Sequence, residues 1–273
     1  MKRYLILAIN CIWVHLLFGQ TLDVGWGEIS EDELLMHSSP IDSGAAAVIL
    51  LNYGRFYYDL DADPVLYRHV KVKIFDAAAY DLSNIKIDYL YSATQKEITN
   101  IKAASYNFDG GKKLIETKLE NKMIFDEDVD GYRRQKKFSV PAVKEGTVFE
   151  YQYQIKLRGK AFNPEFYFQD VYPIKASILE ASIPTVLNYV YVTQLNSLNI
   201  EHTESASGLN MGANDGFISQ REHVWSCYDV PALKMEKFIS GYEDYIAKID
   251  LQLSFIHEIG ESPEYIIKDW ADF

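Results

Sequence analysis

The sequence has little cysteine and more acidic than basic residues. Two cysteines in 273 residues exclude a disulfide-rich scaffold. The 27 Lys+Arg against 39 Asp+Glu give a formal charge of −12, which argues against nucleic-acid binding and broad adhesion to anionic membranes, since both require a basic surface. Because 48% of the residues are hydrophobic, we expect a packed core in one large domain or two small ones.

Long apolar runs are also scarce, and the one that stands out is at the N-terminus. It covers residues 4–18, follows Lys2 and Arg3, and is interrupted by polar residues. A membrane-spanning helix needs about 20 mostly apolar residues, so this run is too short. The pattern predicts a signal peptide over residues 1–20. We therefore expect an extracytoplasmic protein, periplasmic or secreted, with no transmembrane segment after cleavage.

A short helix is predicted directly after this segment. Ser30-Glu31-Asp32-Glu33 has the spacing of a capping box, in which the serine hydroxyl and the glutamate carboxylate each accept a backbone N–H of the first turn. The helix should end before Pro40, because the residue preceding a proline is disfavoured in helical geometry. Residues 21–43 thus form an N-terminal helix and linker.

From residue 44 onward, apolar and polar residues alternate, as is typical of half-buried strands. Residues 66–74 alternate in this way, with His69, Lys71 and Lys73 on the polar face. The same period predicts strands over residues 45–53, 85–90, 98–106, 147–157, 166–172, 178–183, 186–193, 217–225 and 249–255.

This many alternating strands predict an all-β fold. No helical run is long enough for repeated βαβ crossovers, so we expect an antiparallel β-sandwich, immunoglobulin-like or larger, over residues 44–257. A turn at residues 160–164 is a possible sub-boundary, and residues 201–216 are predicted to form a long loop or a loose hairpin. Ser262-Pro263-Glu264 is a typical helix start, so residues 258–273 are predicted to begin a linker helix and to form a C-terminal helical tail.

Cys227, His257 and Asp269 occur in the chain order used by transglutaminase-like cysteine hydrolases. Such chemistry needs a thiolate activated by an imidazole that a carboxylate orients. The local sequence argues against it, because Pro231 disfavours the helix that would follow a nucleophilic cysteine. We therefore assign no catalytic residue and keep these three as the candidates of an enzyme alternative.

Two acidic segments have the spacing of calcium ligands. Asp126, Asp128 and Asp130 match the first positions of an EF-hand loop, but a lysine stands where the bidentate glutamate belongs. The alternative is an acidic turn whose charge pairs with the basic strand after it. The segment of Asp59, Asp61 and Asp63 repeats the spacing but has a proline in place of the turn glycine. We predict no cofactor.

Aromatic residues are concentrated at Phe162, Phe166, Tyr167, Phe168 and Tyr172. If the rings are exposed, they could form a stacking platform for a glycan or peptide. If they follow strand alternation, about half of them pack in the core.

Several segments, in this order, resemble the bacterial envelope domain of unknown function 3857. They are residues 46–50, 67–74, 109–112, 138–151, 172–173 and 225–236, and the resemblance covers roughly residues 40–257. It implies an exported β-sandwich, usually found directly before a transglutaminase-like cysteine-protease domain that carries the catalytic residues.

We therefore expect an exported, non-catalytic β-sandwich protein with a scaffolding or protein- and peptide-interaction role. The resemblance implies a protein or peptide partner, such as a separately encoded transglutaminase-like domain. Nucleic acid is not expected as a partner. A glycan- or peptide-binding module and a cysteine hydrolase using Cys227 remain the alternatives.

Overall fold

The computed structural model describes residues 24–90, 97–110, 113–131, 133–157, 162–195, 197–210, 217–234, 245–257, 260 and 262–267. The predicted signal peptide lies outside these residues. Strands dominate the described chain, and its helices are short: α1 at Glu31–Leu35 and the 3-10 turns η1 at Ala77–Ser83 and η2 at Asn121–Met123. None of the described helices is long and apolar enough to cross a membrane. The predicted all-β class is confirmed.

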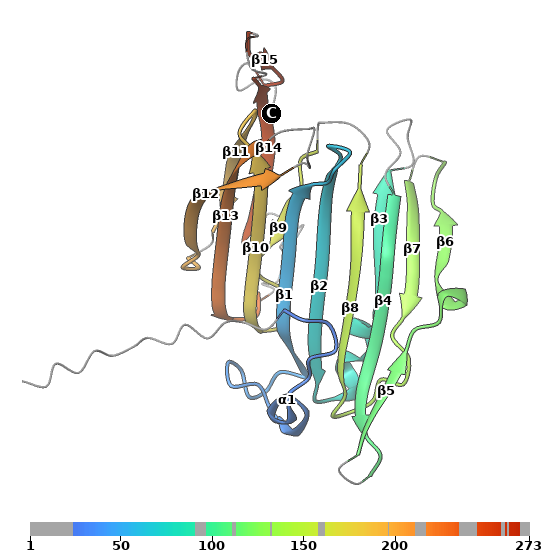
Figure 1. Ribbon diagram of the computed structural model, residues 1–273. Coiled ribbons are helices and arrows are strands. Elements are labelled where there is room, and N and C mark those ends of the chain that lie inside the picture. The colour runs from blue at the N-terminus through green and yellow to red at the C-terminus, as the bar shows by residue number, and fades with distance from the viewer. Residues whose placement is uncertain are drawn as a thin grey trace, which may run out of the picture.

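One large sheet forms the frame of the molecule (Figure 1). Its eight strands lie side by side in the order β12-β13-β10-β1-β2-β8-β4-β5. Their bounds are Glu201–Asn210 (β12), Phe217–Val230 (β13), Ile174–Pro184 (β10), Ala47–Tyr58 (β1), Pro64–Ile74 (β2), Val148–Lys156 (β8), Glu97–Phe108 (β4) and Leu114–Lys118 (β5).

Two smaller sheets complete the fold. One joins β11 (Leu187–Gln194), β14 (Lys248–Ile256), β15 (Glu264–Tyr265) and β9 (Glu165–Tyr167). The other joins β3 (Asn84–Leu90), β7 (Arg133–Ser139) and β6 (Phe125–Asp128). Of the two alternatives predicted for residues 201–216, the structure shows the hairpin over the described residues 201–210, because β12 pairs with β13 from Glu201 to Asn210.

Not every strand pair is antiparallel. β1 and β10 run parallel, with Ile49 opposite Ile174 and Tyr57 opposite Ser182, and the other recorded pairs are antiparallel. Alternation shows which side chains share a face but carries no information on strand direction. The prediction of a purely antiparallel sandwich is therefore wrong at this central pair.

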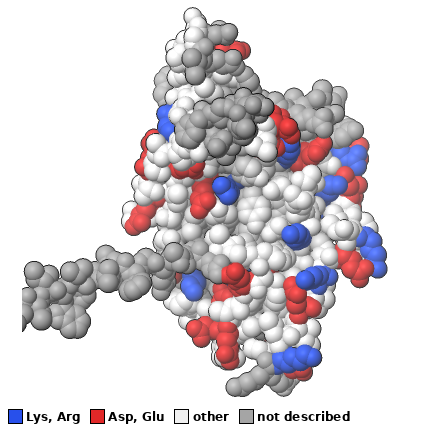
Figure 2. All heavy atoms as spheres, in the orientation of Figure 1, with Lys and Arg blue, Asp and Glu red and all other residues white. Residues whose placement is uncertain are grey.

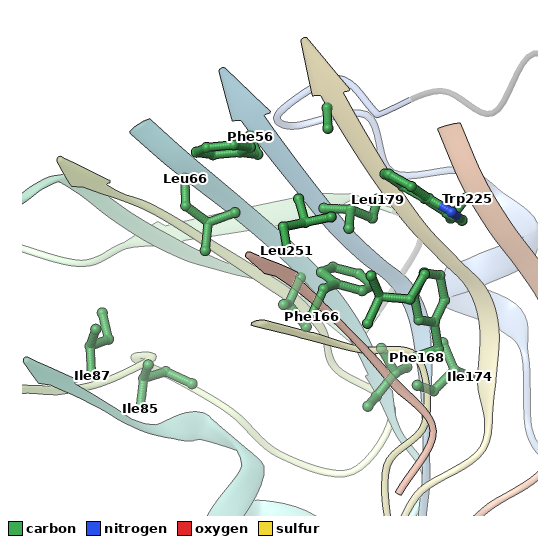
Figure 3. Packing of buried hydrophobic residues seen from close by; sticks show 14 of the residues in the cluster. Phe56, Leu66, Ile85, Ile87, Phe166, Phe168, Ile174, Leu179, Trp225 and Leu251 are labelled. Atoms are coloured by element: carbon green, nitrogen blue, oxygen red, sulfur yellow. The ribbon is translucent and has the colours of Figure 1, made fainter. Parts of the chain in front are cut away.

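The main core fills the space between the large sheet and the two smaller ones. Phe166 of β9 and Leu251 of β14 point toward Leu179 of β10 in this layer (Figure 3). A Cβ atom at Gly54 would lie 2.7 Å from the Phe166 ring, so the glycine lets the two layers approach closely. The cluster draws residues from both sides of 160–164.

The N-terminal helix forms as its capping box predicts. The Ser30 hydroxyl accepts a 3.1 Å hydrogen bond from the Glu33 backbone N–H, and the Glu33 carboxylate accepts a 2.9 Å bond from the Ser30 N–H. The helix ends at Leu35, before Pro40. Leu34 is buried against Val48 and Tyr106, so α1 packs on the opposite face of the large sheet from the main core.

This contact changes the environment of β2. The face that alternation assigns to solvent carries His69, Lys71 and Lys73, and all three are buried. Residues 24–36 cover it: Lys71 Nζ donates to the Glu28 carbonyl over 2.7 Å, and Lys73 Nζ donates to the Leu34 carbonyl over 2.6 Å. The prediction of a half-buried strand is therefore wrong for β2, which is buried on both faces.

The start of the predicted C-terminal helix is a strand. Glu264 pairs with Ile256 and Tyr265 with Phe255, and the N–H groups of Ile266 and Ile267 donate to the Ser254 carbonyl. The free edge of β14 offers backbone partners that compete with the helix start. The prediction of a helix beginning at Ser262 is thus wrong over residues 262–267, and residues 268–273 lie outside the described chain.

Candidate functional site

The candidate cysteine site is not assembled in the described residues. Cys227 lies on β13 in the main core with 5% of its surface exposed, and burial raises the pKa of its thiol. Its strand partner is Ser177 of β10. His257 is exposed just after β14, in a different sheet, and Asp269 lies outside the described residues. An activated nucleophile needs a lowered pKa and an adjacent base, and in the described chain no hydrogen bond joins Cys227 to His257.

The acidic segment at Asp126 forms ion pairs with its neighbouring strand. Asp126 lies on β6, where Arg134 and Lys136 of β7 approach its carboxylate at 3.1 and 2.8 Å. Partial burial raises the pKa of this carboxyl, but the hydrogen bonds from Lys136, Tyr89 and Arg134 outweigh it and hold the pKa below its usual range. The remaining pairs are Asp130 with Arg133 and Glu127 with Lys137.

The other members of this calcium candidate are also engaged. Asp128 accepts a hydrogen bond from the Gly131 backbone N–H, and Asp130 accepts one from the Arg133 N–H. Because these contacts and ion pairs use the carboxylates, the segment matches the alternative of an acidic turn that pairs with the basic strand after it.

The second acidic segment forms a tight cluster around a lysine. Carboxylate oxygens of Asp59, Asp61 and Asp63 lie within 4.8 Å of one another, a separation that suits a cation. Lys156 Nζ of β8 lies 2.6 Å from Asp59, 3.3 Å from Asp63 and 3.6 Å from Asp61. The hydrogen bond to Asp59 raises the pKa of Lys156. The ammonium thus supplies the positive charge that a metal ion would otherwise bring.

The aromatic segment does not form an exposed platform. Phe162, Phe166 and Phe168 are buried in the main core, and Phe166 contacts Phe168 edge to face at 4.7 Å between ring centroids. Tyr167 and Tyr172 are partly buried. The core-packing alternative is confirmed for the three phenylalanines, and the platform that a glycan-binding module would need is not present among these rings.

Beside these rings, the structure forms a polar pocket that the sequence reasoning missed. It has a volume of about 220 Å³ and lies between the large sheet and the segment that joins β9 to β10. Asn52 of β1, Arg68 of β2, Tyr151 of β8 and the consecutive residues Gln169 and Asp170 supply its polar groups. One signal could have found it: Arg68 is a charged residue in the apolar phase of its strand, between Leu66 and Val70.

The donor side of the pocket is held rigidly. Arg68 Nη2 donates to Asn52 Oδ1 over 2.7 Å, and its guanidinium lies 4.5 Å from the centroid of the Phe166 ring. Asn52 Nδ2 in turn donates to the Tyr167 carbonyl and the Ser177 hydroxyl, both over 2.8 Å. These contacts fix the side chains in one orientation, so the guanidinium needs little reordering to meet a ligand.

The acceptor side carries unused hydrogen-bonding capacity. Gln169 is 8% exposed, and its Oε1 has no hydrogen-bond partner among the described residues, while its Nε2 donates to the Pro231 carbonyl over 3.1 Å. Burial raises the pKa of the neighbouring Asp170, although the Tyr172 N–H donates to its carboxylate. A buried acceptor without a donor is costly, so this wall favours a ligand that donates hydrogen bonds.

Comparisons with known proteins agree with this architecture. The family model of DUF3857, a domain of unknown function with solved structure, matches residues 61–234. A solved structure of a "putative protease" from Parabacteroides distasonis ATCC 8503 is similar, at 14% sequence identity and a TM-score of 0.57. The similarity covers 77% of this chain and 41% of that one, so this chain spans about two fifths of the protein it matches. At this identity, the likeness shows the fold alone. No curated protein matches the chain.

Proposed function

The chain belongs to the DUF3857 family, and from this membership we propose that it is an exported, non-catalytic domain that binds a protein or peptide partner. The observation that carries the proposal is the pocket between the sheets. Its lining includes a fixed donor, Arg68, and a buried acceptor, Gln169 Oε1, that has no hydrogen-bond partner among the described residues. The described residues that approach it include no thiol, serine or histidine that could serve as a nucleophile or base there.

The ligand chemistry follows from these two walls. An amide group donates through its N–H and accepts through its carbonyl, so a carboxamide side chain matches both sides. A pocket of about 220 Å³ is small beside the ~300–1,000 Å³ of small-molecule sites. It suits one side chain of a peptide segment, with the remainder of the partner lying on the surface outside.

The partner we propose is a separately encoded transglutaminase-like domain. The support is the resemblance of this chain to envelope domains that precede such a domain, together with the export expected from residues 1–20. On the face shown in Figure 2, acidic and basic side chains are interspersed, and the described part of that face has no broad positive patch. A protein partner suits this surface better than nucleic acid does.

Binding of two near-isosteric peptide probes tests the proposal. We expect acetyl-Gly-Asn-Gly-amide to bind the full chain in the millimolar range, as followed by NMR chemical-shift changes at the pocket residues. Acetyl-Gly-Leu-Gly-amide should bind about tenfold more weakly, because it leaves the Gln169 acceptor unpaired. Gln169→Met should remove this preference while conserving side-chain length.

The matched control is Asp32→Asn, an exposed acid on α1 that lies outside the pocket. It should bind both probes as the wild type does. If the asparagine probe causes no saturable shifts at the pocket residues, or if Gln169→Met keeps the preference, the pocket does not bind a peptide amide and the proposal fails.

A further inference from the structure

The large sheet ends at β12, whose outer edge is open in the part of the chain that the structure describes. β12 pairs with β13 on its inner side, and no described strand pairs with its outer side. Figure 1 shows β12 at one end of the row of strands. Residues 201–208 of this strand are all exposed. The backbone N–H and C=O groups that point outward are therefore available to a further strand.

This edge lacks the features that protect edge strands from pairing. β12 is ten residues long and contains no lysine, arginine or proline. It pairs with β13 over its whole length without a register shift, so no bulge bends it away from the sheet. The opposite edge differs, because β5 has only five residues and ends in Lys118. Of the two ends of the large sheet, β12 is therefore the one suited to receive a strand.

The side chains of β12 match a second copy of the same strand. His202 and Glu204 project from one face, and Thr203 projects from the other. When two copies pair antiparallel about a two-fold axis normal to the sheet, one residue of each strand faces itself on the axis. With Thr203 on the axis, His202 of each copy lies opposite Glu204 of the other. Pairs of this kind, an imidazole against a carboxylate, stabilise neighbouring strands.

The alternative registers are less favourable. With Glu204 on the axis two carboxylates would face each other, and with His202 on the axis two imidazoles would. With Ser205 on the axis, no basic group would lie opposite an acidic one. With Thr203 on the axis, Glu201 lies opposite Ser205 of the second copy, whose hydroxyl can donate to it. This register therefore pairs both acidic residues of the strand with donors and opposes no like charges.

His202 and Glu204 are both free to make this contact. His202 Nε2 lies 3.2 Å from His223 Nδ1, while its own Nδ1 has no hydrogen-bond partner among the described residues. Trp225 stacks on the His202 ring at 4.7 Å between centroids and so limits its rotation. The side chain of Glu204 is 52% exposed, and its recorded ion-pair partner, His223, is 3.9 Å away. A second copy can thus meet both groups without breaking a close ion pair.

From these observations we propose that two copies of this protein join by antiparallel pairing of β12, with Thr203 on the two-fold axis. The two large sheets then form one continuous sheet, and main-chain hydrogen bonds supply most of the contact. The interface is isologous, so one contact covers the open edge of both copies. It does not involve the pocket beside Arg68, and the failure of either proposal leaves the other standing.

Sedimentation velocity of the full chain over a range of concentrations tests the interface. We expect a reversible monomer–dimer equilibrium with a Kd on the order of 10 µM, because a single strand edge buries less than the ~1,600 Å² of a standard interface. Thr203→Lys places two ammonium groups opposite each other on the axis. It should weaken dimerisation by about tenfold or more, as lysine does at natural sheet edges.

Two matched variants serve as controls, with folding of each checked by far-UV circular dichroism. Thr203→Val keeps the shape of the side chain without the charge and should dimerise at least as well as the wild type. Leu114→Lys adds the same charge at an exposed position on β5 and should leave dimerisation unchanged. The proposal is overturned if the wild type stays monomeric at about 20 times the expected Kd, if Thr203→Lys dimerises as the wild type does, or if Leu114→Lys disrupts the dimer equally.

Disulfide cross-linking tests the register. With both native cysteines replaced by alanine, Thr203→Cys brings two thiols to the axis, where opposed Cα atoms lie about 4.5–5.5 Å apart, a separation that a disulfide spans. Ser207→Cys lies four residues further along the strand, so its two copies are roughly 27 Å apart. Mild oxidation should therefore give covalent dimers of Thr203→Cys only. Equal yields from the two variants would contradict the proposed pairing.

Discussion

Lys73 provides a direct test of the contact between the N-terminal segment and the large sheet. The side chain is completely buried, and its ammonium donates to the carbonyls of Leu34 and Gly146, both over 2.6 Å. Burial lowers the pKa of Lys73 to about 8, against an ordinary value of 10.5, although Glu33 opposes the shift. The perturbation is Lys73→Met, which keeps the volume and removes the charge.

The direction of the pH effect follows from proton counting. Between pH 8 and 10.5 the unfolded chain keeps the Lys73 proton, while the folded protein has lost it. Because the unfolded state binds more protons, the free energy of unfolding rises with pH across this window, by about 1.4 kcal/mol per unit and about 3 kcal/mol in total. Lys73→Met lacks this contribution, so the stability difference between wild type and variant should shift in favour of the wild type as pH rises.

Urea denaturation followed by far-UV circular dichroism measures this difference. Curves for both proteins should be collected below pH 10, because the tyrosines of the unfolded chain begin to ionise near that pH. In the folded protein, burial raises the pKa of tyrosines such as Tyr67 to about 12, so above pH 10 the two states would also differ in tyrosine ionisation. We expect the difference to change by about 2 kcal/mol between pH 8 and 9.5. Lys122→Met, at an exposed position, should follow the wild type. A difference that stays flat or moves the other way would refute the buried-ammonium reasoning.

Three further outcomes are expected. Gly54→Ala should destabilise the protein by about 1–3 kcal/mol in urea, because its Cβ would lie 2.7 Å from the Phe166 ring; an unchanged midpoint would contradict the close layer contact. In the wild type the Lys156 ammonium neutralises the aspartates around it, so the wild-type Tm should not respond to Ca²⁺. Lys156→Met removes this charge, and the Tm of the variant should rise with Ca²⁺. Equal responses of both proteins would count against this role. Cys227 should react with a thiol reagent slowly in buffer and rapidly in urea, because it is buried with a raised pKa; rapid native labelling would show an accessible thiolate instead.

Local patterns in the sequence were sufficient for much of the secondary structure. The period of two predicts most strands of the large sheet, because side chains of a strand point to opposite faces whatever its partners are. The capping box at Ser30 predicts α1, because all its hydrogen bonds lie within one turn. The buried state of Phe166 and Phe168 follows from the same alternation once the core has two layers.

Other features depended on contacts between distant segments. The sequence of β2 itself does not show that residues 24–36 cover its polar face. The alternation therefore predicts that His69 and Lys73 are exposed, although both are buried. The parallel pairing of β1 with β10, and the addition of β15 to the edge of β14, depend on which backbone groups remain free in the assembled sheets.

The sequence by itself thus determined the strands, the capped helix and the acidic, cysteine-poor character of the protein, since these depend on residue type and short-range periodicity. Only the tertiary structure decided what lies on each face of each strand. It buried Cys227 away from His257 and brought Lys156 among three aspartates. Such juxtapositions join residues far apart in the chain, and no local pattern records them.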